Sequence, residues 1–343
     1  MTIMPAESWL GGESRWIDLG GPVHYLDFGG PADGPVIVCV HGLGGSAVNW
    51  SAIAPLLTGR YRLLAPDLAG HGLTRSAGRG TDVASNRALL HRFIESVPAI
   101  CTGPVGPVKP GSPVPAARPA GAAGPAWPVI LLGNSMGGMI SLLEASAEPG
   151  AVAGLILVDP ALPFVAARPD PTVAGLFALY LMPGLNRLLM SRRRSMPPEA
   201  LVARILSLCC ADVSRIPADI VAQHVEVARR RAAFPGTGQD FAAAMRSVIG
   251  HVRSPSYRRQ LRSVGCPVLM LHGARDRLVP VAAALAAVRA QPSWSLVVFS
   301  GVGHVPQLEV PGDTARAMTE WLGSAGQRAA VAATPGPASA LPA

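Results

Sequence analysis

Six short runs of valine, isoleucine and leucine recur along the chain, separated by longer segments of helical character. Runs this short and this uniformly apolar are typical of parallel strands that are buried under helices on both faces. Two earlier stretches, 15–19 and 23–28, alternate between apolar and polar residues and are joined by Gly20-Gly21, which predicts an antiparallel hairpin at the sheet edge. The sequence therefore predicts an α/β fold with a mostly parallel, eight-stranded sheet flanked by helices. The six apolar runs cover 36–40, 63–65, 129–132, 155–158, 268–271 and 296–299.

Composition narrows the class of protein further. The chain has 343 residues, of which 49% are hydrophobic and 15% charged, and it has no run of about eighteen or more apolar residues. These values exclude a wholly disordered chain and an ordinary transmembrane protein. The net charge of +8 comes from 29 Lys and Arg against 21 Asp and Glu. Because no aromatic-interleaved basic groove, zinc-finger spacing or basic zipper accompanies that charge, we expect no nucleic-acid partner.

The cysteines and the first residues of the chain indicate where in the cell the protein is located. The chain has five cysteines, an odd number, and none forms a C-x-x-C pair. This pattern argues against a disulfide framework and favours a reducing environment. The first residues lack a basic segment followed by an apolar core, so we expect no secretory signal and a cytoplasmic protein.

The order of these patterns predicts one core interrupted by a helical insertion. Residues 1–159 form the first half of the core and 263–323 the second half, whereas 160–262 show helical character and form a cap, or lid. Within the first half, residues 101–128 hold eight Pro and five Gly, which predicts an exposed insertion. Residues 324–343 are rich in Ala, Gly and Pro, and we expect a disordered tail there.

The first part of the predicted cap allows two interpretations. Residues 174–195 are apolar, are broken by Pro183-Gly184, and end in three arginines at 192–194. Composition favours a cap helix that packs on the core and ends in solvent-exposed charge. Contact with greasy substrate, or peripheral contact with a membrane surface, stays open as the alternative.

A serine follows the predicted strand at 129–132 in the setting of a sharp turn. The segment Gly133-Asn134-Ser135-Met136-Gly137 matches G-x-S-x-G between a strand and a helix. The glycines two residues before and two after Ser135 let the backbone turn tightly enough to present the hydroxyl above the sheet. The start of the next helix directs N–H groups toward the same point, where a tetrahedral oxyanion would form.

A second glycine-rich turn, His41-Gly42-Leu43-Gly44-Gly45, follows the strand at 36–40. Glycines allow the backbone to approach a ligand closely and to offer N–H groups to it. The backbone amides of Leu43 and Met136 together predict an oxyanion hole. We expect His41 to orient this loop by hydrogen bonding.

An acid and a histidine follow the last two predicted strands. Asp276 lies in LHGARDRLVP after the strand at 268–271, and His304 lies in GVGHVPQLE after the strand at 296–299. The carboxyl ends of parallel strands meet at one edge of a sheet, where active sites form in open α/β folds. We therefore expect Ser135, Asp276 and His304 to lie together.

These motifs resemble those of the α/β-hydrolase fold serine hydrolases. That class includes carboxylesterases, monoacylglycerol lipases, carbon-carbon bond hydrolases and cofactor-free haloperoxidases. The resemblance extends from about residue 15 to residue 322 and is interrupted by the Pro-rich insertion and weakened in the cap. The matching segments are HGLGG, APDLAGHG at 65–72, GNSMGG, LHGARDRLVP and GVGHVPQLE.

The resemblance implies a catalytic role for each matching residue. It makes Ser135 the nucleophile, His304 the general base and then acid, and Asp276 the carboxylate that orients the imidazole. Asp159, in LILVDP, stands at a position that some members of the class use for the acid. Asp276 is favoured because its sequence context is the commoner match, whereas Asp159 before Pro160 is suited to capping a turn.

The leading hypothesis is hydrolysis of a carboxylic ester of a small hydrophobic substrate, without a cofactor or metal. Carbon-carbon bond hydrolysis of ring-cleavage products is the first alternative, because Asn134 precedes the nucleophile as it does in those enzymes. The oxyanion loop lacks their proline, however, and HVPQLE lacks their aromatic residue after the histidine. Cofactor-free perhydrolase or haloperoxidase chemistry uses the same triad and stays open, as does a non-enzymatic binding module. Epoxide and haloalkane hydrolysis are disfavoured because they need a carboxylate nucleophile at position 135. No residue argues for a particular oligomeric state.

Overall fold

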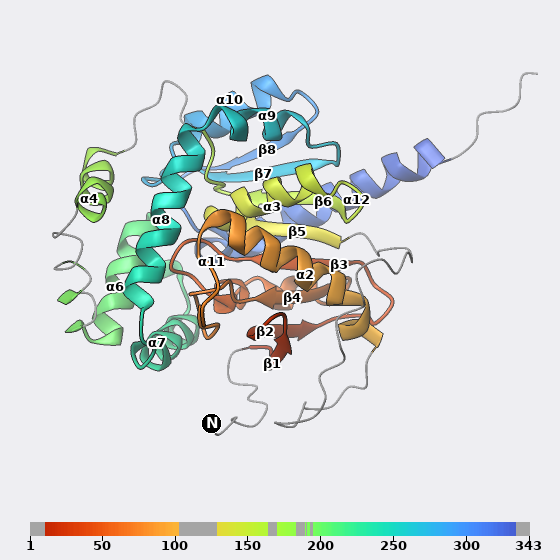
Figure 1. Cartoon of the computed structure of the whole chain (residues 1–343). Coiled ribbons are helices and arrows are strands. Elements are labelled where there is room, and N and C mark those ends of the chain that lie inside the picture. Colours follow the sequence, from red (N-terminus) through yellow and green to blue (C-terminus); the bar gives the residue numbers. More distant parts are fainter. Residues whose placement is uncertain are drawn as a thin grey trace, which may run out of the picture.

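The computed structural model describes residues 11–102, 129–163, 170–182, 189, 191–192 and 195–333. Of the insertion predicted at 101–128, residues 103–128 lie outside the described residues, whereas 101 and 102 are the last two residues of a helix. Figure 1 shows a central sheet with helices on both faces and a group of helices beyond the ends of its strands. The strands are β1 (Glu13–Asp18), β2 (Pro22–Gly29), β3 (Val36–Val40), β4 (Arg62–Pro66), β5 (Val129–Asn134), β6 (Val152–Val158), β7 (Val268–Gly273) and β8 (Ser295–Phe299).

The sheet has the predicted eight strands, in the order β1-β2-β4-β3-β5-β6-β7-β8. β1 pairs with β2 and β2 with β4 in antiparallel fashion, and every later pairing is parallel. The predicted hairpin at the edge and the parallel centre are thus confirmed. Because β3 and β5 are neighbours at the centre, the glycine-rich loop after β3 lies beside the turn that carries Ser135.

Alternate residues of the buried strands pack into two separate cores. Val36, Val38 and Val40 of β3 join one core, whereas Ile37 and Cys39 join the other. Successive side chains of a strand point to opposite faces, so a continuous apolar run serves both cores. The first core is covered by α2 (Val83–Thr102), α3 (Met136–Ala147), α9 (Pro255–Arg262) and α10 (Val281–Ala290), and the second by η2 (Ala47–Trp50), α1 (Ala54–Leu57) and α12 (Pro311–Ala333).

The described residues between β6 and β7 contain helices and no strand. A third apolar cluster joins two of these helices to the short helix α11 (Pro306–Glu309), which follows His304. α9 packs instead against α3, so the end of the predicted cap contacts the layer of helices on the sheet. These helices are α4 (Pro171–Leu181), α6 (Pro198–Cys209), η3 (Val213–Arg215), α7 (Ala218–Ala232), α8 (Thr237–Arg253) and α9.

The apolar segment 174–195 is described only in part. Leu179 near the end of α4 and Met182 just after it are exposed. In the part of the chain that the structure describes, no helix has both the length and the apolar character needed to cross a bilayer.

The C-terminal helix differs from the predicted tail. α12 continues to Ala333, so residues 324–333 are helical rather than disordered. Alanine is the strongest helix former and fills five of these ten positions, whereas the prolines of the predicted tail all lie beyond residue 333. Residues 334–343 lie outside the described residues.

Candidate active site

Ser135 occupies a strained turn between β5 and α3. Its backbone angles are φ 55° and ψ −116°, a combination that non-glycine residues rarely adopt. The turn is fixed by its backbone, because the Ser135 N–H donates to the Val158 carbonyl at 3.0 Å and the Ser135 carbonyl accepts from the Ala161 N–H at 3.0 Å. Gly137 has no room for a side chain, since a Cβ there would collide with the Val40 carbonyl oxygen. The turn thus leaves Ser135 partly exposed among buried neighbours.

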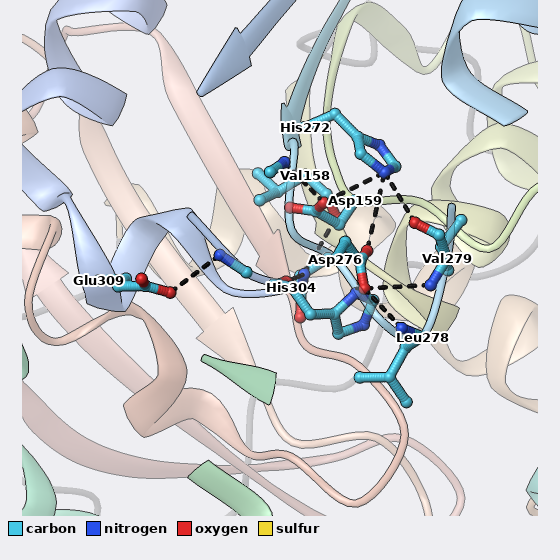
Figure 2. Close-up of polar contacts among 11 residues, drawn as sticks. Val158, Asp159, His272, Asp276, Leu278, Val279, His304 and Glu309 are labelled. Atoms are coloured by element: carbon cyan, nitrogen blue, oxygen red, sulfur yellow. Dashed lines mark hydrogen bonds and ion pairs between the residues drawn. The ribbon is translucent and has the colours of Figure 1, made fainter. Parts of the chain in front are cut away.

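His304 and Asp276 form a buried pair at the same edge of the sheet (Figure 2). The His304 Nδ1 and Asp276 Oδ2 atoms are 2.7 Å apart, and the Asp276 side chain is fully buried. The other oxygen, Oδ1, accepts the backbone N–H groups of Leu278 at 2.7 Å and Val279 at 3.1 Å. Burial alone would raise the pKa of Asp276, but the charge of His304 and its hydrogen bond outweigh it and lower that pKa below the ordinary value. The carboxylate form is therefore favoured.

The backbone around His304 is held by the cap as well as by the core. The His304 N–H donates to the Cys209 carbonyl, at the end of α6, at 2.6 Å. On the core side, the Asn134 amide Nδ2 donates to the His304 carbonyl at 3.1 Å and to the Val158 carbonyl at 3.0 Å. The loop that carries the histidine is thus attached to both the cap and the core.

Glu309, which no sequence motif assigns a role, completes this attachment. Its buried carboxylate accepts the backbone N–H groups of Gly303 at 3.0 Å and of Ala211 and Asp212 at 3.1 Å each. Arg215 lies 3.5 Å away on the cap side. Glu309 lies within the motif GVGHVPQLE, so its position was visible, but its partners Ala211 and Asp212 come from a segment almost a hundred residues earlier. Only the fold brings them together.

One cavity brings four of the predicted site residues together. It has a volume of about 340 Å³, and Ser135, His304, Leu43 and Met136 line it. Asp276 lies behind His304 and supports it through the Nδ1 hydrogen bond. The remaining wall is largely apolar and comes mostly from α6, α7 and α8, including Leu201, Val202, Ile205, Leu206, Val227, Ala228, Met245, Val248, Ile249 and Val252.

Polar groups of the cap also line this cavity, among them His224 and Arg231. Burial lowers the pKa of His224 to about 4, so its imidazole is neutral at pH 7. Arg231, two turns further along α7, donates to the carbonyl oxygens of Gly70 and Gly72. Arg231 therefore fastens the cap to the loop after β4.

The loop after β3 is oriented as predicted. His41 bonds through Nδ1 to the Gly42 carbonyl at 2.8 Å and accepts the Leu68 N–H at Nε2 at 3.0 Å. Since Nε2 accepts, Nδ1 carries the proton and the ring is neutral. Burial lowers the pKa of His41, which agrees with this assignment.

Asp159 and Asp276 lie in the same buried patch (Figure 2). Asp159 follows β6, accepts the Gly273 N–H at 2.9 Å, and lies 3.4 Å from the Nε2 atom of His272. Among the described residues, the hydrogen bond to the His304 ring comes from the Asp276 side chain, at 2.7 Å, and not from that of Asp159. The direct contact with the imidazole is thus made by Asp276.

Potential metal ligands gather at one place among the described residues. Single donor atoms of Asp159, Asp276 and His304 lie within 4.8 Å of one another. Both Asp276 oxygens already accept hydrogen bonds, from His304 and from the Leu278 and Val279 amides. These hydrogen bonds are those of an acid–imidazole pair, in which the carboxylate orients the ring.

Comparison with known proteins places this site in a family. The model of the Alpha/beta hydrolase family matches residues 37–317. The chain belongs to that family. This α/β hydrolase is 27% identical over 293 residues to the pimeloyl-[acyl-carrier protein] methyl ester esterase of Aromatoleum aromaticum, covering 82% of this chain and 95% of that one. It is 25% identical over 305 residues to the monoglyceride lipase of Homo sapiens, covering 88% and 86%.

Solved structures agree on the fold. A putative lipase from Acinetobacter baumannii superposes with a TM-score of 0.69 at 23% identity, covering 94% of each chain. The relatives support activity of the esterase and lipase type for this α/β hydrolase. The reaction class is therefore hydrolysis, and its substrate is a separate question.

Proposed function

We propose that this α/β hydrolase cleaves carboxylic esters of hydrophobic substrates through an acyl-enzyme on Ser135. One observation carries the proposal: Ser135 and His304 line the same apolar cavity, and His304 is bound at Nδ1 to the buried Asp276 carboxylate. With Nδ1 engaged as a donor, Nε2 is the nitrogen that accepts a proton.

The proposed first half-reaction transfers the acyl group to the enzyme. His304 Nε2 takes the proton of the Ser135 hydroxyl as the oxygen bonds to the ester carbonyl carbon. The carbonyl electron pair moves onto oxygen, and the backbone N–H groups of Leu43 and Met136 stabilise that oxyanion. The bond to the alcohol oxygen then breaks, and His304 gives its proton to the departing alcohol.

The second half-reaction repeats these steps with water. His304 removes a proton from water as the water oxygen attacks the acyl carbon, and the Leu43 and Met136 amides again stabilise the oxyanion. Collapse releases the carboxylic acid and returns the proton to Ser135. The Asp276 carboxylate stabilises the His304 imidazolium during both halves.

The apolar wall of the cavity supports the proposal of a hydrophobic substrate. Binding sites of this size gain affinity mainly by burying apolar surface, and a few polar groups orient the ligand. The two curated relatives named above act, by their names, on a methyl ester of an acyl group and on a monoglyceride, both carboxylic esters with an acyl chain.

Asn134, the residue that favours carbon-carbon bond hydrolysis, has another explanation in this fold. Both hydrogens of the Asn134 amide are accounted for by the Val158 and His304 carbonyls. Asn134 therefore supports the loop of the base and needs no substrate to explain it. Ester hydrolysis remains the proposed reaction.

A series of p-nitrophenyl esters from acetate to laurate tests this proposal. We expect turnover with an optimum at intermediate or long chains, and a loss of at least about 10⁴-fold in kcat for Ser135→Ala. Ser141→Ala, a buried serine of α3 outside the cavity, serves as the matched control. Equal activity of wild type and Ser135→Ala would reject the mechanism, and turnover of a vinylogous diketone but of no ester would favour the carbon-carbon alternative.

A further inference from the structure

Asp159 has an unusual backbone for its residue type. Its φ is 46°, a positive value that only two other non-glycine residues share among those described, Ser135 being one of them. Positive φ strains a residue with a Cβ, so the surroundings must hold it there. The Asp159 N–H donates to the Leu271 carbonyl at 2.9 Å, which ties this strained residue to β7.

The side chain of Asp159 is buried with one oxygen unsatisfied. Oδ1 accepts the Gly273 N–H at 2.9 Å, whereas Oδ2 is buried and has no hydrogen-bond donor among the described residues. A carboxyl oxygen of Asp159 lies within 4.8 Å of one of Asp276. Two carboxyls buried this close do not both ionise readily, because their like charges repel, and a proton on one of them would let it donate to the other.

The hydrogen bonds decide which carboxyl keeps the charge. Asp276 accepts two backbone N–H groups and lies against His304, and all three stabilise its anionic form. Asp159 has a single backbone donor. Burial and then the charge of Asp276 raise the pKa of Asp159 well above its ordinary value, which agrees with this division.

We propose that Asp159 is a positioning residue that carries a proton at neutral pH and donates it in a hydrogen bond to the Asp276 carboxylate. That bond holds Asp276 in place for His304. The contribution to catalysis rests on the proposed function, whereas the presence of the proton does not. The role differs from that of the catalytic acid, because a neutral carboxyl cannot stabilise an imidazolium by charge.

Other titratable groups face Asp159 from each neighbouring element. His272 donates through Nε2 to the Val279 carbonyl at 2.9 Å, and burial lowers the pKa of His272, so it adds no positive charge at pH 7. The negative charge of Glu309 further favours the protonated form of Asp159. The groups that face the Asp159 carboxyl are Asp276 and His272 from the β7 region, His304, Glu309 from α11, and Cys209 from α6.

Thermal unfolding as a function of pH detects the proton without any substrate. A carboxyl whose pKa is raised by folding binds more protons in the folded than in the unfolded state, so it destabilises the fold as pH rises above its unfolded pKa of about 4. Asparagine fits the same place, because its amide donates where the carboxyl hydrogen did, its oxygen accepts from Gly273, and it tolerates positive φ. Asp159→Asn cannot titrate.

We therefore expect the melting temperature of Asp159→Asn to rise relative to wild type by about 2 °C per pH unit above about pH 4, up to the pKa of Asp159. Asp33→Asn, in an exposed turn, is the matched control and should follow wild type. Parallel curves for Asp159→Asn and wild type would overturn the proposal. If the variant does not fold, the wild-type infrared spectrum decides: a protonated carboxyl band at neutral pH supports the proposal, and its absence refutes it.

Kinetics test the positioning role. We expect Asp159→Ala to lower kcat about tenfold and to shift the acid limb of the pH–rate profile. Asp159→Asn should keep most of the wild-type kcat and most of the wild-type pH profile. A loss in Asp159→Asn as large as that of Asp276→Asn would show that the Asp159 carboxylate is the working acid and refute the proposal. If no variant and no wild-type sample hydrolyses an ester, the proposed function fails, and the unfolding experiment still tests the proton.

Discussion

The edge of the sheet and the cap build the two sides of one cavity in different ways. At the sheet edge, hydrogen bonds fix each functional group: the Ser135 backbone to Val158 and Ala161, and the Asp276 carboxylate to two amides and His304. The cap helices α6, α7 and α8 contribute mainly apolar side chains. Their polar attachments to the core include Glu309 and Arg231.

Because of this difference, we expect the sheet edge to determine the reaction and the cap to determine which substrate binds. Groups that move protons must be held within a fraction of an ångström, and such precision comes from hydrogen bonds on rigid elements. An apolar wall needs only the correct volume and tolerates changes in side-chain identity. We therefore expect substitutions at the sheet edge to reduce the rate for every ester, and substitutions in the cap to change which ester is preferred.

The largest effect that is independent of the ester is expected at His304. Without an imidazole, no group takes the Ser135 proton, so His304→Gln should lower kcat by about 10⁴-fold for short and long esters alike. Steady-state kinetics on p-nitrophenyl acetate and on a long-chain ester measure this. His251→Gln, on α8 outside the cavity, is the control. A loss confined to long esters would mean that His304 acts on substrate binding rather than on proton transfer.

Substitutions at Glu309 test the attachment of the cap to the sheet edge. Glu309→Ala leaves three backbone N–H groups without an acceptor, and we expect it to lower the free energy of unfolding by about 3 kcal/mol and kcat by about tenfold. Glu309→Gln keeps one acceptor oxygen and should lose less of both. Chemical denaturation and ester kinetics measure the two effects. Unchanged kcat in a folded Glu309→Ala protein would show that the cap attachment does not position His304.

Cap substitutions should change selectivity at little cost in rate. Ala228 lines the cavity, so Ala228→Phe should fill part of it and lower the kcat/KM ratio of long to short esters by about tenfold or more. Ala222→Phe, on the exposed side of the same helix, is the matched control and should leave the ratio unchanged. An equal loss for all chain lengths in Ala228→Phe would break the separation of reaction from substrate.

The strands and the positions of the chemical groups were predictable because both are local in sequence. All eight strands lie where apolar runs or alternation predicted them, since burial on both faces demands continuous Val, Ile and Leu. The G-x-S-x-G turn was visible because only glycine fits two residues before and two residues after Ser135. Asp276 and His304 followed from their places after the last two strands.

What could not be predicted depends on distant contacts. Glu309 binds amides at 211 and 212, and Asp159 meets Asp276 from a different strand. The sequence shows these carboxyls but neither their partners nor their burial, which set their protonation. The cap was predictable only as helical, because apolar helices carry no signal for how they pack over a cavity.

The central claim is that Ser135 is an activated nucleophile, and covalent labelling tests it most directly. Purified protein would be incubated with a fluorophosphonate probe and analysed by intact mass, with the labelled peptide then sequenced. We expect one adduct per chain on Ser135, no adduct in Ser135→Ala, and much slower labelling in His304→Gln. Labelling of Ser135→Ala at the wild-type rate, or no labelling of wild type, would contradict it.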